Sequence, residues 1–197
     1  MRLWLPRIDR TRRVLNKVLT VNQVRKFILS PDITSPRGYQ HRCLFLTQYS
    51  AGLRASELMG MTTEAVDENN ETITVTRKGG DIQELPVGEL GGEYLGTYLD
   101  EIRLAFKPTG NHLWCNRDGS ELKYTQYRRI VKKHMASLNL DFSSHDLRRA
   151  AATHLVKAKA PILGVARFLN HRNIDSTKVY LKIFPQELRK AVDRLGF

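Results

Sequence analysis

The sequence predicts a mainly α-helical protein with one small antiparallel β-hairpin, an α+β class in which helices dominate. Apolar residues recur at intervals of three and four in most segments, as in helices that bury one face. The only clear alternation of β-branched residues lies at 72–76 and 82–87. Gly79 and Gly80 separate these two runs and are typical of a hairpin turn.

The first half of the chain contains start and stop signals for three helices. A short helix is expected after Thr20, because threonine is a favoured N-cap and apolar residues follow at helical spacing. Residues 35–38 read as a turn, and a longer helix is expected over 39–50. Gly52 then interrupts the helix, and Ser56 or a neighbour can cap the next one.

Helices also dominate the second half of the chain. One is predicted over 89–106 and an amphipathic, basic one over 125–138, with a glycine-containing loop between them. Shorter helices are expected at 146–157, 162–169 and 176–183. After Pro185, a last short helix carries an apolar stripe formed by Leu188, Ala191, Val192 and Leu195. Such a helix is too short to be stable alone, so its stripe needs a partner surface.

Charge is distributed unevenly along the 197 residues, whose formal net charge is +12. Residues 1–30 hold eight Lys/Arg and one acidic residue, residues 51–101 three and eleven, and residues 117–190 sixteen and six. A basic–acidic–basic chain is expected to fold with one positive surface, which favours a nucleic-acid partner. The alternative is a basic protein that its charge merely keeps soluble.

Cysteine usage and hydropathy indicate an intracellular protein. Cys43 and Cys115 are the two cysteines, and they lie far apart with no histidine at metal-ligand spacing. This pattern argues against a structural zinc site and a disulfide framework, and it predicts two buried free thiols. No window approaches the ~18 apolar residues of a membrane span, and the N-terminus does not resemble a signal peptide. We expect a cytoplasmic, nucleoid-associated protein without a membrane partner.

The stretch from 144 to 180 gathers residues suited to a phosphodiester. His145 and Arg148 are three apart and share one face of a helix start, while His171 and Tyr180 follow at separations of 23 and nine residues. Arginine offers a planar cationic fork, histidine a hydrogen bond and tyrosine an oxygen nucleophile. Each residue also has an ordinary interpretation: the histidines can cap a helix or lie in a turn, and Tyr180 can be a core aromatic residue.

Two earlier residues have the same ambiguity. Arg54 follows a helix break and can point into a cleft, or it can be a surface arginine paired with Glu57 three residues later. Lys78 is expected at the tip of the hairpin, where a single exposed lysine is usually an ordinary surface residue.

Four separated blocks together resemble the catalytic domain of the tyrosine recombinases, the family of phage integrases and Xer-type chromosome-dimer resolvases. The blocks are Gly52-Leu53-Arg54-Ala55-Ser56-Glu57-Leu58, the hairpin lysine Lys78, His145-Asp146-Leu147-Arg148-Arg149 with Ala152-Thr153-His154-Leu155, and His171 through Tyr180. They occur in the order typical of the family, and the resemblance covers about residues 20–197. It implies the tyrosine recombinase catalytic-domain fold.

The resemblance assigns a role to each matching residue. Arg54 and Arg148 correspond to the arginines that hold the scissile phosphate, and Glu57 to an acidic residue that supports the site. Lys78, His145, His171 and Tyr180 correspond to the hairpin lysine, the two histidine positions and the nucleophile. Asn170 departs from the usual glycine before the second histidine. No segment corresponds to the helical core-binding domain that usually comes first, so the chain is expected to be a catalytic-domain fragment or a minimal protein.

The implied function is a site-specific DNA recombinase that cleaves and rejoins strands through a 3′-phosphotyrosyl intermediate, without a metal, cofactor or ATP. A type IB topoisomerase-like enzyme and a non-catalytic DNA-bridging module are the alternatives. We expect a basic arm (1–19), a catalytic domain (20–184) and a protomer-docking helix (185–197). The expected partners are double-stranded DNA and other protomers, in a tetrameric synaptic complex. The residues expected to contact DNA are Arg128, Arg129, Lys132, Lys133, Arg149 and Arg172.

Overall fold

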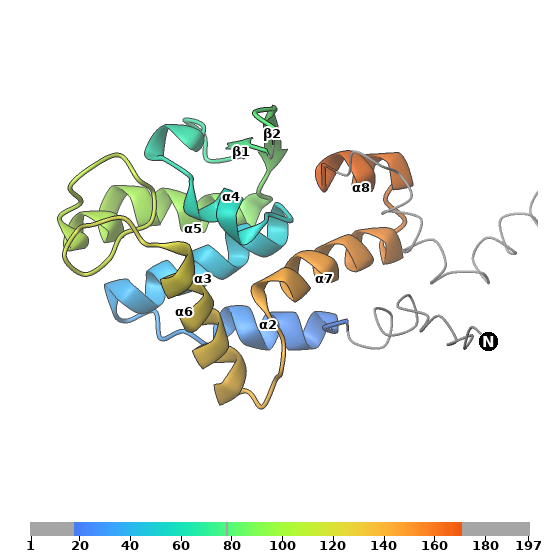
Figure 1. Ribbon diagram of the computed structural model, residues 1–197, viewed down its shortest axis with the longest axis horizontal. Coiled ribbons are helices and arrows are strands. Elements are labelled where there is room, and N and C mark those ends of the chain that lie inside the picture. Colours follow the sequence, from blue (N-terminus) through green and yellow to red (C-terminus); the bar gives the residue numbers. More distant parts are fainter. Residues whose placement is uncertain (1–17, 78, 171–197) are drawn as a thin grey trace, which may run out of the picture.

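A computed structural model describes residues 18–77 and 79–170, which form helices and one two-stranded antiparallel sheet (Figure 1). The helices of the first half are α2 (Val21–Leu29), α3 (Pro36–Ser50), α4 (Ala55–Met59) and the short 3₁₀ turn Thr63–Ala65. Strands β1 (Thr72–Thr76) and β2 (Ile82–Pro86) follow. The second half contains α5 (Glu89–Thr97), α6 (Tyr124–Ser137), α7 (Ser144–Lys157) and α8 (Ile162–Phe168). The predicted mainly helical class with one hairpin is confirmed.

Three predicted features lie outside the described residues: most of the basic arm, Lys78, and everything after Asn170. The expected helix over 176–183 and the expected docking helix over 185–197 belong to this last group. The structure therefore tests the predicted elements from the first helix to the end of α8.

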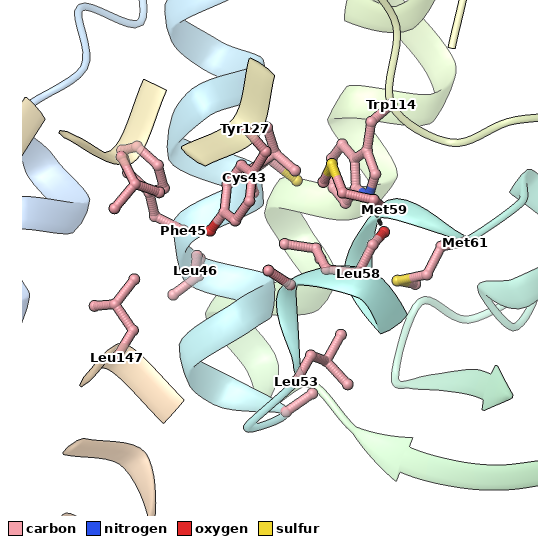
Figure 2. Close-up of a cluster of buried hydrophobic side chains, with 14 of the residues drawn as sticks. Cys43, Phe45, Leu46, Leu53, Leu58, Met59, Met61, Trp114, Tyr127 and Leu147 are labelled. Atoms are coloured by element: carbon pink, nitrogen blue, oxygen red, sulfur yellow. Dashed lines mark hydrogen bonds between the residues drawn. The ribbon is translucent and has the colours of Figure 1, made fainter. Parts of the chain in front are cut away.

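Helix α3 forms the centre of the molecule. It packs against α2, α4, α5 and α7, and Cys43, Leu44 and Phe45 are fully buried on it. Figure 2 shows part of this core, where side chains from α3, α4, α6 and α7 meet. Burial of one such large apolar side chain contributes roughly 1.5–3 kcal/mol to stability. Both cysteines are buried and free, as predicted from their spacing.

The start of α3 corrects the sequence interpretation of residues 35–38 as a turn. The helix begins at Pro36, and the Ser35 hydroxyl accepts a hydrogen bond of 3.1 Å from the backbone N–H of Gly38. Serine at the N-cap and proline in the first turn are both favourable at a helix start. The same residue types are typical of turns, so composition alone does not separate the two structures.

The hairpin forms as predicted, with Thr72 opposite Pro86 and Thr76 opposite Ile82. Ile73 and Val75 face the core, while their strand neighbours are exposed or half-buried. This alternation is what fixes the register of a sheet with one buried face.

The predicted helix over 89–106 is continuous but irregular. After α5, the chain widens into a π-helical turn at Tyr98–Ile102 and then tightens into a 3₁₀ turn at Arg103–Phe106. The Tyr98 hydroxyl donates to both the Gln40 side chain (2.6 Å) and the Leu113 carbonyl (2.9 Å). These contacts join residues far apart in the sequence, so the local apolar pattern does not reveal the change of helix type.

Within the described residues, the last three helices agree with prediction to within two residues at each end. The predicted inner face of α6 is buried: it consists of Tyr127, Ile130, Val131 and Met135. A second small apolar cluster joins α7 to α8. In Figure 1, α8 folds back from the end of α7 toward the hairpin. No helix in the described ranges is long and apolar enough to cross a membrane.

Candidate active site

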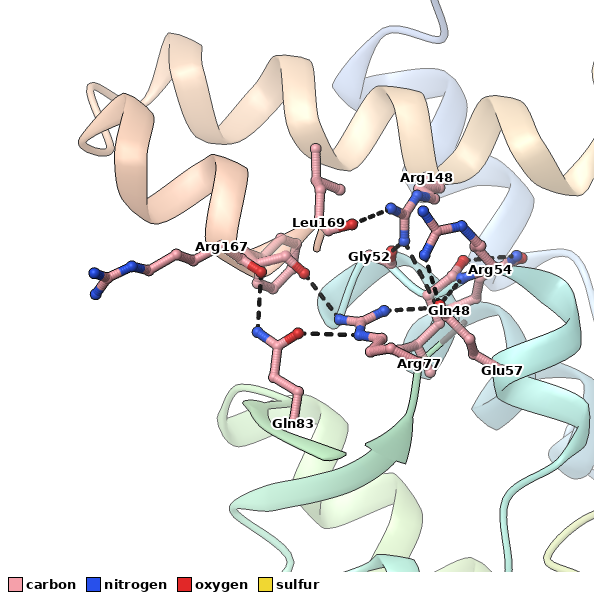
Figure 3. A network of polar contacts seen from close by, with 11 residues as sticks. Gln48, Gly52, Arg54, Glu57, Arg77, Gln83, Arg148, Arg167 and Leu169 are labelled. Atoms are coloured by element: carbon pink, nitrogen blue, oxygen red, sulfur yellow. Dashed lines mark hydrogen bonds and ion pairs between the residues drawn. The ribbon is translucent and has the colours of Figure 1, made fainter. Parts of the chain in front are cut away.

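Glu57 is the centre of a buried polar network between α4, the hairpin, α7 and the end of α8 (Figure 3). Its Oε1 atom accepts from Arg54 Nη1 at 2.7 Å, and its Oε2 atom accepts from Arg77 Nη1 at 2.6 Å. Nη1 of Arg148 lies 3.7 Å from the same Oε2 atom. One carboxylate therefore hydrogen-bonds the guanidinium groups of Arg54 and Arg77, and the guanidinium group of Arg148 lies close to it.

The turn before α4 requires glycine at position 52. Gly52 has a φ of +58°, and a Cβ atom there would lie 2.4 Å from the Phe168 ring. Its carbonyl accepts a hydrogen bond of 2.6 Å from Arg148. Glycine is the residue that tolerates both the left-handed backbone and the close approach. The glycine of the predicted motif thus brings α8 and Arg148 against the turn that carries Arg54.

Arg54 is the N-cap residue of α4. The cap therefore lies two residues before Ser56, which was one candidate for this position from the sequence. The backbone N–H of Arg54 donates to Glu57 Oε2 at 2.8 Å. Glu57 lies in the first turn of α4, where an acidic residue stabilises the start of a helix. The Arg54 side chain remains 35% exposed. The ion pair with Glu57 that we considered from the sequence is therefore present, and the guanidinium still reaches solvent.

Arg148 and His145 both lie on α7, one turn apart, and differ in burial. The Arg148 side chain is only 5% exposed, and its guanidinium donates to the carbonyls of Gly52 and Leu169. His145 is exposed in the first turn of the helix. The spacing of three residues places them on one side of the helix, as expected.

The surroundings of Glu57 and of the nearby His145 lower the pKa values of both groups. Burial by itself would raise the pKa of the Glu57 carboxyl group, but the Arg54 amide and the guanidinium groups of Arg54 and Arg77 outweigh it and hold that pKa below its usual range. Desolvation of the ring and the nearby charges of Arg149 and Arg148 lower the pKa of His145. Glu57 is therefore ionised and His145 neutral at pH 7.

Sequence reasoning missed two members of the network, Arg77 and Gln83. Arg77 is 2% exposed and donates from Nε to Gln83 Oε1 at 3.0 Å and from Nη2 to the Phe168 carbonyl at 2.9 Å. Gln83 donates in turn to the Arg167 carbonyl at 3.0 Å. The alternation of β1 contained a signal, since Arg77 continues the buried face of Ile73 and Val75 at a spacing of two.

The other predicted site residues divide into exposed and undescribed groups. Four basic residues expected to contact DNA are exposed on α6: Arg128, Arg129, Lys132 and Lys133. Arg149 is half-buried and pairs with Asp146 at 3.2 Å. Lys78, His171, Arg172 and Tyr180 lie outside the described residues. No three His, Cys, Asp or Glu side chains of the described ranges are grouped to hold a metal ion.

The fold is that of a tyrosine recombinase catalytic domain. The structure aligns with the XerA recombinase at a TM-score of 0.75 and 18% identity, over 90% of this chain and 62% of that one. A Tn1549 transposon integrase aligns at a TM-score of 0.76 and 20% identity, over 92% of this chain and 66% of that one. At these identities, the likeness concerns the fold alone.

The chain belongs to the phage integrase family, whose model matches residues 17–187. It is 30% identical to the tyrosine recombinase XerD of Staphylococcus saprophyticus, over 94% of this chain and 63% of the relative. It is 31% identical to XerD of Xanthomonas axonopodis, over 90% of this chain and 62% of the relative. The chain thus spans somewhat less than two thirds of the length of these relatives.

Proposed function

We propose that this chain carries out the strand cleavage and rejoining of a site-specific DNA recombinase. The observation that carries the proposal is the meeting of Arg54, Arg148 and Glu57 at one place, beside a hairpin that bears Lys78 in the sequence. Two guanidinium groups near one carboxylate, of which Arg54 is hydrogen-bonded to it, offer planar donors and positive charge for a phosphodiester. Membership of the phage integrase family supports the same chemistry.

In the proposed reaction, the phenolic oxygen of Tyr180 attacks the scissile phosphorus. The bond to the 5′ oxygen breaks, and a 3′-phosphotyrosyl bond forms in its place. Tyrosine has a pKa of about 10, so its proton must be removed, and neutral His145 is suited to accept it. Lys78 donates a proton to the leaving 5′ oxygen. The reverse steps with another strand rejoin the DNA without ATP, because the phosphotyrosyl bond conserves the energy.

The two arginines differ in access to the phosphate. Arg54 is the more exposed and is suited to make the first contact with a non-bridging oxygen. Arg148 is buried and donates to the carbonyls of Gly52 and Leu169, which fix its guanidinium near Glu57. His171 is proposed to donate a further hydrogen bond to the same oxygens, and Glu57 holds the arginines without reacting.

Helix α6 is proposed as the main DNA-contacting element. Its basic residues Arg128, Arg129, Lys132 and Lys133 are exposed, and the Arg128 guanidinium lies 5.8 Å from the centre of the Tyr124 ring. A groove between α6 and residues 141–146, at the start of α7, is lined by three of them. Phosphate contacts by such residues supply affinity that depends on salt but not on base sequence. Arg149 and Arg172 are proposed to extend this surface.

The remaining proposals concern assembly and location. Residues 185–197 are proposed to dock on a neighbouring protomer in a tetrameric complex on double-stranded DNA, with residues 20–184 as the catalytic unit and residues 1–19 as a basic arm. The solved structures that resemble this chain include XerH bound to a difH substrate and a lambda integrase dimer bound to a core site. An enzyme acting on chromosomal DNA is expected in the cytoplasm, associated with the nucleoid.

Covalent capture tests the proposed nucleophile directly. The full chain is incubated with a pool of random-sequence duplexes that carry 5′-bridging phosphorothiolate linkages, with EDTA present and ATP absent. Cleavage releases a 5′ thiol that rejoins poorly, so protein attached to a 3′ phosphate should accumulate and survive denaturation. The attached strands are then sequenced, which gives the preferred site.

Tyr180→Phe is the test variant because it removes only the phenolic oxygen. It should bind duplex DNA like the unchanged protein and give no adduct. Tyr124→Phe is the matched control, since Tyr124 is an exposed tyrosine of α6, and it should still form the adduct. An adduct that persists in Tyr180→Phe rules out this nucleophile.

A further inference from the structure

Arg77 makes three hydrogen bonds to three different segments of the chain. Its Nη1 atom donates to Glu57 in α4, its Nε atom to Gln83 in β2, and its Nη2 atom to the carbonyl of Phe168 at the end of α8. The side chain is 0% exposed. Arginine carries five donors in a rigid fork, so one residue can fix three partners at once.

Two of the three contacts of Arg77 lie next to a residue of the proposed site. Glu57 binds Arg54, and Phe168 precedes Leu169, whose carbonyl accepts from Arg148. Consecutive carbonyls at the end of α8 thus accept from Gln83, Arg77 and Arg148. The Arg167 carbonyl also accepts from the backbone N–H of Asn170 at 2.8 Å. Positive charge at the C-terminal end of a helix is favourable for the helix dipole.

Stability alone is a weak reason for this arrangement. Burial lowers the pKa of the Arg77 guanidinium, because removing the cation from water is costly. The charge of Glu57 acts in the opposite direction and raises that pKa. A buried ion pair contributes little on balance, and apolar residues of similar volume are often as stable in its place. The orientation of the carboxylate is what an apolar residue at this position could not supply.

The distances within the network indicate what that orientation does. Glu57 Oε2 lies 2.6 Å from Arg77 but 3.7 Å from Nη1 of Arg148. If Arg77 were removed, the carboxylate would be drawn toward Arg148, the nearest remaining buried cation. A close Glu57–Arg148 pair would neutralise charge that the proposed reaction uses to bind the phosphate.

We propose that Arg77 is a positioning residue of the strand-cleavage site, which holds Glu57 on Arg54 and away from Arg148 and anchors the end of α8. This inference rests on the proposed function. It predicts that loss of Arg77 lowers the cleavage rate only when the scissile phosphate carries its negative charge, and that the fold is unaffected. A misplacement of about 1 Å in an active site can reduce the rate by roughly 10²-fold.

Arg77→Lys tests the proposal, because lysine keeps the charge but carries its donors on one nitrogen, which cannot reach three separate partners. Arg103→Lys is the matched control: Arg103 is also buried and donates to the carbonyls of Gly110 and His112. Single-turnover adduct formation is measured for both on a duplex from the capture experiment, with its ordinary scissile phosphate. Arg77→Lys should be slower than Arg103→Lys by roughly tenfold or more, and its DNA affinity should be unchanged.

A second duplex carries a neutral methylphosphonate at the scissile position, where there is no negative charge for the arginines to balance. On this substrate, the rates of the two variants should differ by no more than roughly threefold, which corresponds to a difference of about 0.65 kcal/mol in activation free energy. A purely structural defect would slow both substrates equally. An equal loss on both, or a rate like that of Arg103→Lys on the ordinary phosphate, overturns the inference.

Two further results keep the outcomes apart. If Arg77→Lys is unfolded in a thermal melt, Gln83→Leu takes its place, because it removes the partner of Arg77 Nε and leaves Glu57 intact. Gln83→Leu should show a smaller loss that also shrinks on methylphosphonate, and no loss in it overturns the inference. Failure of the unchanged protein to form any adduct overturns the proposed function itself, together with this inference.

Discussion

Gly52, Arg54 and Glu57 show how single residues determine the geometry of this site. The positive φ of Gly52 turns the chain so that Arg54 caps α4, and the first turn of that helix brings Glu57 onto the Arg54 amide. A side chain larger than hydrogen at position 52 would meet the Phe168 ring. A motif of six residues therefore fixes the backbone of the site, and distant arginines complete it.

The pH dependence of cleavage is predicted by the environment of His145. Desolvation and the charges of Arg149 and Arg148 lower the pKa of His145 below its ordinary value of about 6.5. The ring therefore stays neutral at pH 7 and protonates only as the pH falls below that value. If it accepts the proton of Tyr180, the single-turnover rate should be constant near pH 7 and decrease in acid, with its midpoint below about 6.5.

The variant His145→Gln separates this role from a general effect of acid. It keeps a hydrogen-bonding side chain but cannot accept a proton, so it should be slower by roughly 10²–10⁴-fold and lose the acidic limb. His112→Gln, at a half-buried histidine outside the site, is the control and should keep the limb. Retention of the limb in His145→Gln contradicts the assignment.

At the scale of elements, the sequence predicted what depends on local pattern. The inner face of α6, the two strands and their glycine turn follow from periods of 3.6 and 2, and all are present in the structure. The start of α3 was misread because Ser35 and Pro36 are typical of both turns and helix starts. The π-helical turn after α5 was missed because Tyr98 is held by Gln40, 58 residues away.

The residues of the proposed site also fall into those that the sequence indicated and those that it did not. The resemblance indicated Arg54, Glu57 and Arg148, and the structure brings these three together. Arg77 and Gln83 were missed because their contacts cross from the hairpin to α8, over 91 and 84 residues. The alternation of β1 indicates that position 77 faces the core, but no local period indicates the partners of Arg77 or Gln83. The assigned roles of Lys78, His171 and Tyr180 stay predictions that rest on the resemblance.

Helix α6 is predicted to set the salt dependence of DNA binding. Arg128 and Lys132 are exposed one turn apart, and both line the groove between α6 and the start of α7. Each phosphate contact that is lost should reduce the slope of log affinity against log salt by about 0.9. The double variant Arg128→Gln/Lys132→Gln should therefore bind a random-sequence duplex more weakly, with a slope smaller by up to about 1.8.

The control for α6 is Lys107→Gln, which removes an exposed charge from the loop after the 3₁₀ turn. It should leave the slope unchanged, although it alters the net charge in the same direction. Fluorescence anisotropy over a range of salt concentrations measures both variants against the unchanged protein. Equal slopes in all three proteins would show that another face of the molecule contacts the DNA.

At the scale of the whole molecule, a histidine pair joins the helices of the core. Nδ1 of His41 in α3 lies 3.2 Å from Nε2 of His134 in α6, and Nδ1 of His134 lies 3.0 Å from the Ser30 hydroxyl after α2. Burial, His134 and the charges of Arg37 and Lys133 lower the pKa of His41 to about 3. Burial and the charge of Lys133 lower the pKa of His134 as well.

This pair predicts that acid destabilises the fold before the carboxylates titrate. In the unfolded chain both histidines have a pKa of about 6.5. In the folded protein the pKa of His41 is about 3, and the pKa of His134 is also lowered. Below pH 6.5 the unfolded state therefore binds more protons, and the free energy of unfolding should decrease as the pH falls. The slope is at most about 1.4 kcal/mol per pH unit for each group. Urea unfolding between pH 7 and pH 5 measures the slope of the free energy of unfolding against pH. The variant His41→Gln should reduce this slope by the contribution of His41. The pair lies at the junction of α2, α3 and α6, so an unchanged slope in His41→Gln would mean that this junction stays open to protons from solvent in the folded protein.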